Sequence, residues 1–170
     1  MYFILILVLM YSLSLHTDIT FLGVTTGCTW WKYLTFNLCH TSFFHLLTNS
    51  LIFFFYWRLL KQATVLRYLL PVLLVSAICA ALISKTDVPT IGASALIYSM
   101  IAALCVAIQY GIFRINKTGK IKYYAIIGIS LVFPALISSH HVNYKMHAAA
   151  FLISLILCFI LRKPLYATQK

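Results

Sequence analysis

Three short stretches of the sequence carry side chains that could do chemistry inside otherwise apolar segments. Ser94 stands between alanines in the stretch 91–98, where a long apolar run begins. His147 opens the last apolar run, and the stretch 40–49 holds two more histidines and an asparagine. Polar side chains are costly to keep in the hydrocarbon region of a membrane, so each one suggests a function. The alternative for Ser94 is that it is one of the small residues that let transmembrane helices pack closely.

A serine and a histidine can together cleave an acyl bond. A serine hydroxyl is a weak nucleophile until a neighbouring base takes its proton, and histidine is the usual base near neutral pH. His45 and Asn49 are four residues apart and therefore share one face of a helix. Both could donate hydrogen bonds to a developing oxyanion, together with the backbone N–H of Ser94. The residue types thus predict acyl transfer by Ser94 and His147 if their helices meet.

Intramembrane histidines and asparagines also have roles other than catalysis. A lone intramembrane histidine or asparagine more often joins helices by hydrogen bonds or lines an ion path. A channel or transporter with proton-carrying histidines would place polar residues at several depths, whereas the last three apolar runs hold few of them below their outer third. The placement of the histidines and Asn49 at one depth, together with Ser94, favours the enzyme.

Composition excludes two other classes of protease. The sequence contains no glutamate, so it has no HExxH zinc-binding helix. Its two aspartates, Asp18 and Asp87, both fall in loops, which excludes an intramembrane aspartyl pair. For the same reason a Ser–His dyad is a simpler interpretation than a triad. No metal and no cofactor is expected.

The overall composition indicates an integral membrane protein. The 170 residues are 63% hydrophobic and only 9% charged, whereas a soluble domain is about half apolar and a quarter charged. We expect a single membrane domain over residues 1–170. The net charge of +11 could suggest a nucleic-acid partner, but the Lys and Arg residues lie between apolar runs, as in membrane proteins. No nucleic-acid partner is therefore expected.

The apolar runs predict an all-α bundle of six transmembrane helices. They cover residues 1–15, 42–57, 68–84, 91–113, 123–139 and 146–161. Several are shorter than the roughly 20 residues of a comfortable span, so ragged helix ends or local thinning of the bilayer are expected. Residues 1–15 could be a signal peptide, but no Lys or Arg precedes them, which favours a retained span.

The first loop, residues 18–40, carries Trp31 and Lys32, which are typical of the membrane interface. Cys28 and Cys39 share this loop and could pair if it faces an oxidising compartment. The other cysteines lie in apolar runs and are expected to be packing residues.

The distribution of Lys and Arg predicts the orientation in the membrane. Ten of them lie in the connections 58–67 and 114–122 and in the tail 162–170, and three lie in the alternate loops. The excess of positive charge on cytoplasmic loops then places both termini in the cytoplasm. The serine and the histidines lie just inside the outer ends of their helices, in one layer of the membrane.

Four features of the sequence together carry a family resemblance. They are Trp31-Lys32-Tyr33, the spacing of His40, His45 and Asn49, the stretch Gly92-Ala93-Ser94-Ala95 with Tyr98, and His147-Ala148-Ala149-Ala150. In that order they are similar to a Trp-Arg motif, a His-x4-His-x3-Asn pattern, a GxSG motif with a stacking tyrosine, and a histidine followed by a small-residue seam. In these features the chain resembles a rhomboid intramembrane serine protease of the minimal six-helix bacterial type, from Trp31 to about Ser154.

The resemblance implies a role for each matched residue. Ser94 would be the nucleophile and His147 its base, with the oxyanion hole formed by His45 and Asn49. The supporting residues would be Gly92, His40 and Tyr98, and the anchors of a first loop lying partly in the membrane would be Trp31 and Lys32.

The resemblance also implies the substrate and the location. The enzyme would hydrolyse peptide bonds in or next to transmembrane segments of other membrane proteins, in a bacterial inner membrane, with its active site near the outer face. Substrate identity, the cleavage site and the oligomeric state are left open.

The sequence departs from the family pattern at three places. Ala95 replaces the second glycine of GxSG, Lys32 replaces arginine, and Ala150 and Ser154 stand where glycines are usual, so the two helices are expected slightly further apart. None of these changes removes a reacting group. The alternative function is a rhomboid-like pseudoprotease that binds membrane clients without cleaving them, but such a relative usually lacks the serine or the histidine.

Overall fold

The computed structural model describes residues 2–113, 115–137 and 142–166, and the side chains of all of these except 130–137. Apart from one isolated β-bridge, every regular element in this part of the chain is a helix. The long helices are α1 (Tyr2–Ser14), α3 (Phe43–Ala63), α4 (Leu66–Ile83), α5 (Ser94–Gln109), α6 (Lys117–Ile137) and α7 (Tyr144–Ile160). The short ones are η1 (Thr20–Leu22), α2 (Lys32–Thr35), η2 (Phe36–Leu38) and α8 (Arg162–Leu165). The predicted all-α class is confirmed.

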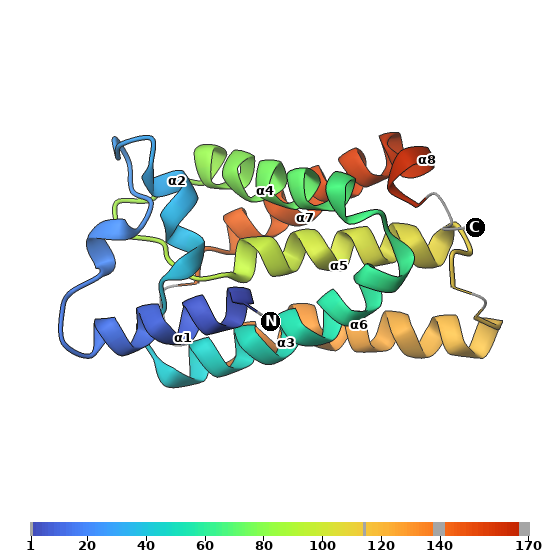
Figure 1. Ribbon diagram of the computed structural model, residues 1–170, viewed down its shortest axis with the longest axis horizontal. Coiled ribbons are helices and arrows are strands. Elements are labelled where there is room, and N and C mark those ends of the chain that lie inside the picture. Colours follow the sequence, from blue (N-terminus) through green and yellow to red (C-terminus); the bar gives the residue numbers. More distant parts are fainter. Residues whose placement is uncertain (1, 114, 138–141, 167–170) are drawn as a thin grey trace.

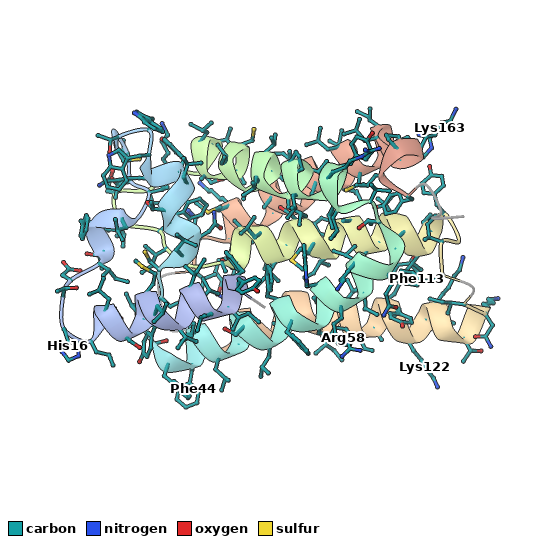
Figure 2. The ribbon with its side chains drawn as sticks, in the orientation of Figure 1. His16, Phe44, Arg58, Phe113, Lys122 and Lys163 are labelled. Atoms are coloured by element: carbon teal, nitrogen blue, oxygen red, sulfur yellow. The ribbon has the colours of Figure 1, made fainter. Side chains whose placement is uncertain are left out.

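Helix α5 lies at the centre of the bundle (Figure 1). It contacts α3, α4, α6 and α7, and thirteen of its sixteen residues are buried. The long helices run along the long axis of the molecule, with the first loop and α2 at one end and α8 at the other (Figure 1). His16 marks the first end, and Phe113 and Lys163 lie at the opposite end (Figure 2). The two ends are therefore formed by different segments of the chain.

The predicted run 91–113 was too long at both ends, and glycine explains both errors. Gly92 has φ +122°, a backbone conformation that residues with a side chain rarely adopt. The helix therefore begins only at Ser94. At the other end Gly111 has φ +69°, its N–H donates to the Ile108 carbonyl, and the next N–H donates to that of Ala107. This is the Schellman pattern that ends a helix.

Two other helices extend further than predicted, because the apolar runs end at charged residues where the helices do not. Helix α3 continues six residues past the predicted end at 57 and stops at Thr64, whose backbone is extended. Helix α6 begins six residues before the predicted start at 123, after the Asn116 side chain accepts the N–H of Gly119. Lysine and arginine mark where a helix leaves the apolar layer, and the helix itself continues into water. The remaining predicted runs agree with their helices within two residues.

Two of the helices, α3 and α4, are long and apolar enough to cross a membrane by length and composition. Helices α1, α5 and α7 are apolar but have 13, 16 and 17 residues, below the roughly 20 that a full span needs. The number of six spans therefore stays a prediction. Arg114 and Lys170, which enter the charge count, lie outside the described residues.

Helices α5 and α7 pack along the predicted seam of small residues. Ala150 and Ser154 are completely buried. The Ser154 hydroxyl donates to the Ser99 carbonyl on α5 at 2.8 Å, and the Ser99 hydroxyl lies 3.5 Å from the Ala150 carbonyl. Serine at this position thus adds a hydrogen bond between helices that a glycine could not make.

The first loop is joined to the segment that leads into α5. Val24 and Thr90 exchange two backbone hydrogen bonds, at 3.0 and 2.9 Å, and form the isolated bridge. The Gly92 N–H donates to the Phe36 carbonyl at 2.8 Å. The five cysteines, Cys28 and Cys39 among them, are free thiols. The loop is therefore held by its backbone and its packing, with no cross-link.

Replacing Trp31 by alanine should lower the thermal midpoint in detergent. The ring is half-buried at the start of α2, with Lys32 Nζ 5.7 Å from its centroid, and each kcal/mol of lost packing should lower the midpoint by about 2–4 °C. Trp30→Ala is the matched control, because the Trp30 side chain is 74% exposed. Lys32→Arg should be neutral or mildly stabilising, since a guanidinium keeps the charge and adds donors. Equal shifts for the two tryptophan variants would contradict this structural role.

Candidate active site

Ser94 and His147 meet at the end of the bundle that carries the first loop. Ser94 is the first residue of α5, and His147 lies in the first turn of α7. His147 Nε2 is 2.7 Å from Ser94 Oγ, within hydrogen-bond range. Both side chains are partly buried. The structure thus brings together the serine and the histidine that the sequence analysis singled out.

Tyr98 holds the His147 ring from one side. The two rings are stacked, with centroids 4.4 Å apart and planes 16° apart. Because Tyr98 is four residues after Ser94, one turn of α5 presents both the hydroxyl and the stacking surface to the same imidazole. No hydrogen-bond partner for His147 Nδ1 is found within the described residues. The ring is therefore oriented by stacking and by its bond to Ser94.

His45 and Asn49 converge on the backbone just before Ser94. A Cβ added to Gly92 would lie 2.8 Å from His45 Nε2 and 3.6 Å from Asn49 Nδ2. Only glycine leaves room for the imidazole and tolerates the positive φ at this position. Ser42 caps α3 by accepting the backbone N–H of His45 at 3.2 Å. The cap fixes the first turn of α3, from which the His45 side chain extends.

His40 links Asn49 on α3 to the backbone just before Ser94. It is completely buried, and its Nε2 lies 2.9 Å from Asn49 Nδ2 and 3.4 Å from the Ala93 nitrogen. Since a backbone N–H can only donate, Nε2 is the acceptor, and the Asn49 amide also donates to it. An amide nitrogen has two hydrogens, so Asn49 retains a second donor. The His40 ring also makes an edge contact with His45, at 4.9 Å between centroids.

The start of α5 leaves backbone donors at Ser94. The first N–H groups of any helix have no intrahelical partner, and Ala93 provides no side-chain cap for them. Asn49 and His45 lie against Gly92 in the same segment, so side-chain and backbone donors gather close to the start of α5. Such a group of donors is suited to the negative oxygen of a tetrahedral intermediate.

Asn143 was missed by the sequence analysis, although it positions the helix of His147. Its Oδ1 accepts the Met146 N–H at 3.0 Å and caps α7. Its Nδ2 donates to the Ser84 carbonyl at 2.7 Å and to Thr90 Oγ1 at 3.2 Å, in the loop that leads to Ser94. An asparagine directly before an apolar run is a helix-start signal that could have identified the cap. Its bonds to a distant loop left no signal in the sequence.

Trp31 and Lys32 lie away from this group. They are at the start of α2, which packs against α4 and η2. Asp18 and Asp87 both lie in loops, as expected. No three histidine, cysteine, aspartate or glutamate side chains that could hold a metal ion gather anywhere in the part of the chain that is described.

The fold and this site define an all-helical protein in which a serine and a histidine meet at the starts of two packed helices. The family model of the Rhomboid domain matches residues 27–164, most of the chain, and the chain belongs to the rhomboid family. Rhomboids are integral membrane proteins and generally intramembrane serine proteases. The comparison with curated proteins and the comparison with solved structures each found no significant match.

Asn143→Ala should slow the reaction of Ser94 with a fluorophosphonate, a probe for activated serines. It removes a cap, worth about 1 kcal/mol, and also the bonds that tie α7 to the loop before Ser94. Asn116→Ala is the matched control, because Asn116 also caps a helix but at the start of α6. Both variants should lose thermal stability, but only Asn143→Ala should lose labelling rate in the folded fraction. Equal labelling rates would mean that Asn143 is only a cap.

Proposed function

We propose that this protein is an intramembrane serine protease that hydrolyses peptide bonds in or next to transmembrane segments of other membrane proteins. The observation that carries the proposal is the 2.7 Å contact between Ser94 Oγ and His147 Nε2. Membership of the rhomboid family supports the same reaction class. Ser94 and His147 form the catalytic dyad, and no cofactor takes part.

The reaction follows from the roles of these side chains. Ser94 Oγ attacks the carbonyl carbon of the scissile bond while its proton passes to His147 Nε2. The carbonyl oxygen becomes negative and is held by Asn49, His45 and the Ser94 N–H. The imidazolium then gives its proton to the leaving amine, which departs and leaves an acyl ester on Ser94. Water, deprotonated by His147, hydrolyses this ester and restores the hydroxyl.

The supporting residues act through the reacting ones. Tyr98 keeps the imidazole facing Ser94, Gly92 gives His45 room, and His40 holds Asn49 to the segment at Ala93. Ala95 is completely buried, and its carbonyl accepts the Ser99 hydroxyl at 2.9 Å. Alanine in place of the family's second glycine is therefore compatible with the helix start that presents Ser94.

The placement in the membrane is part of the proposal. One domain spans the chain, with six membrane spans, both termini in the cytoplasm and the active site near the outer face of a bacterial inner membrane. The ten-to-three distribution of Lys and Arg supports this orientation. In the first loop Phe21, Trp30 and Leu34 are 58%, 74% and 54% exposed, which supports a loop partly embedded in lipid, with Trp31 and Lys32 as its anchors.

Ser94→Ala and His147→Ala should each reduce cleavage of a generic transmembrane substrate in detergent to background. One removes the nucleophile and the other its base, and the described residues offer no replacement at either position. Fluorophosphonate should label the wild type and Ser99→Ala, a control one turn deeper in α5, but not Ser94→Ala. A folded wild type that binds the substrate without cleaving it or taking the label would favour the pseudoprotease instead. Labelling of another serine would refute the assignment of Ser94.

His45→Ala and Asn49→Ala should slow cleavage without abolishing it. Each change removes one oxyanion donor, and such a loss typically lowers kcat by about 100- to 1000-fold. Thr48→Ala, on the same helix, should cleave at close to the wild-type rate. A double His45/Asn49 variant with the wild-type rate would show that these side chains only join helices.

A reporter that is active only outside the cytoplasm should give no signal when it is fused after Lys170. The expectation follows from the charge distribution, which puts the basic connections and the tail inside. The same reporter inserted in the 85–90 loop should be active. A strong signal after Lys170 would mean that one of the six spans is misassigned. Residues 1–15, for which a signal peptide is the alternative, are the first candidate.

A further inference from the structure

A groove of about 560 Å3 lies between α5, α6 and α7, near the ends of α5 and α7 that are furthest from Ser94. Most of its wall is apolar, with contributions from Val106, Leu155, Ile156 and Ile160. Its polar side chains include Gln109 and Tyr124, which are within 3.4 Å of each other. The groove therefore combines an apolar slot with a polar patch, which suits an amphiphilic ligand.

Arg162 stands at the edge of this groove. Its guanidinium lies 5.4 Å from the Tyr110 ring and 4.7 Å from the Phe159 ring, and both residues line the groove. One of its five N–H donors binds the Phe159 carbonyl at 2.8 Å. No further hydrogen bond of this side chain is found among the described residues. A cation with donors to offer thus borders an apolar slot.

The chain's own acidic side chains do not reach this cation. There are two, Asp18 in the loop after α1 and Asp87 in the loop between α4 and α5. Both loops lie at the opposite end of the bundle (Figure 1). The surroundings of Arg162 are otherwise basic, because the connections and the tail at this end hold most of the Lys and Arg residues. No acidic side chain of this chain therefore lies beside Arg162, so an anionic ligand meets no competing carboxylate side chain there.

We propose that this groove binds an anionic diacyl phospholipid, with one acyl chain along the apolar wall and the phosphate on Arg162. Basic pockets between transmembrane helices on the cytoplasmic side recognise acidic headgroups in this way. Charge decides against a protein occupant. A partner's transmembrane helix, or a second copy of this chain, would bring its own basic residues to the same side of the membrane and repel Arg162.

Native mass spectrometry of the purified protein tests the proposal with phosphatidylglycerol and phosphatidylcholine of identical acyl chains. The wild type should bind phosphatidylglycerol about fivefold more tightly, the gain expected for one basic residue near an anionic headgroup. Arg162→Gln should lose this preference. Arg67→Gln is the matched control and should keep it, because Arg67 also stacks on a tyrosine, at 4.8 Å from the Tyr68 ring, but lies on α4 outside the groove.

A second variant tests the acyl-chain half of the site. Ile156 is 58% exposed in the groove wall, so Ile156→Trp should fill the slot without disturbing the core and weaken binding of both lipids. Equal affinity of the wild type for the two lipids would overturn the proposal. So would an equal loss of preference in Arg67→Gln and Arg162→Gln, unchanged lipid binding in Ile156→Trp, or a dimer that excludes lipid. The readout is lipid binding, so it is independent of whether the protein cleaves anything.

Discussion

The close contact between α5 and α7 is the interaction on which the site depends. Ser94 and His147 lie in the first turns of these helices, so their 2.7 Å contact exists only while the helices stay packed. Between helices in a membrane the hydrophobic effect contributes little, and small residues and hydrogen bonds determine association. The seam has both, since Ala150 is completely buried and Ser154 donates to the Ser99 carbonyl. The serine thus adds to the seam an interhelical hydrogen bond that a glycine could not make.

The starts of three helices meet at the site, and they are capped differently. Ser42 caps α3 and Asn143 caps α7, so side chains satisfy N–H groups of both helices. Helix α5 begins after Ala93 without a side-chain cap. A helix N-terminus carries a partial positive charge and unpaired donors, so the one uncapped start lies where Ser94 would generate an oxyanion. The segment before α5 is held through its backbone N–H groups, which donate to the Phe36 carbonyl and to the His40 side chain.

Much of this arrangement was predictable from the sequence, but the helix ends and the long-range contacts of Asn143 were not. Ser94 and His147 could be paired because polar residues are rare in apolar runs, and His45 and Asn49 because their spacing puts them on one face. Helix ends were less predictable, because hydropathy reports the apolar layer whereas a helix ends where its backbone is capped, as at Gly111. The bonds from Asn143 to Ser84 and Thr90 join segments more than fifty residues apart. Only the fold brings such segments together.

The absence of a carboxylate from the described site is consistent with the proposed position of the site in the membrane. An ionised carboxylate beside His147 would orient the ring, but burying it in an apolar layer would cost far more than burying a neutral side chain. The stacked Tyr98 ring orients the imidazole without adding a charge. The same scarcity of acids leaves the cation at the other end of the bundle without an acidic side chain to pair with. One feature of the composition, two aspartates and no glutamate, thus underlies both a serine–histidine pair without a carboxylate at one end and a cation without an acidic partner side chain at the other.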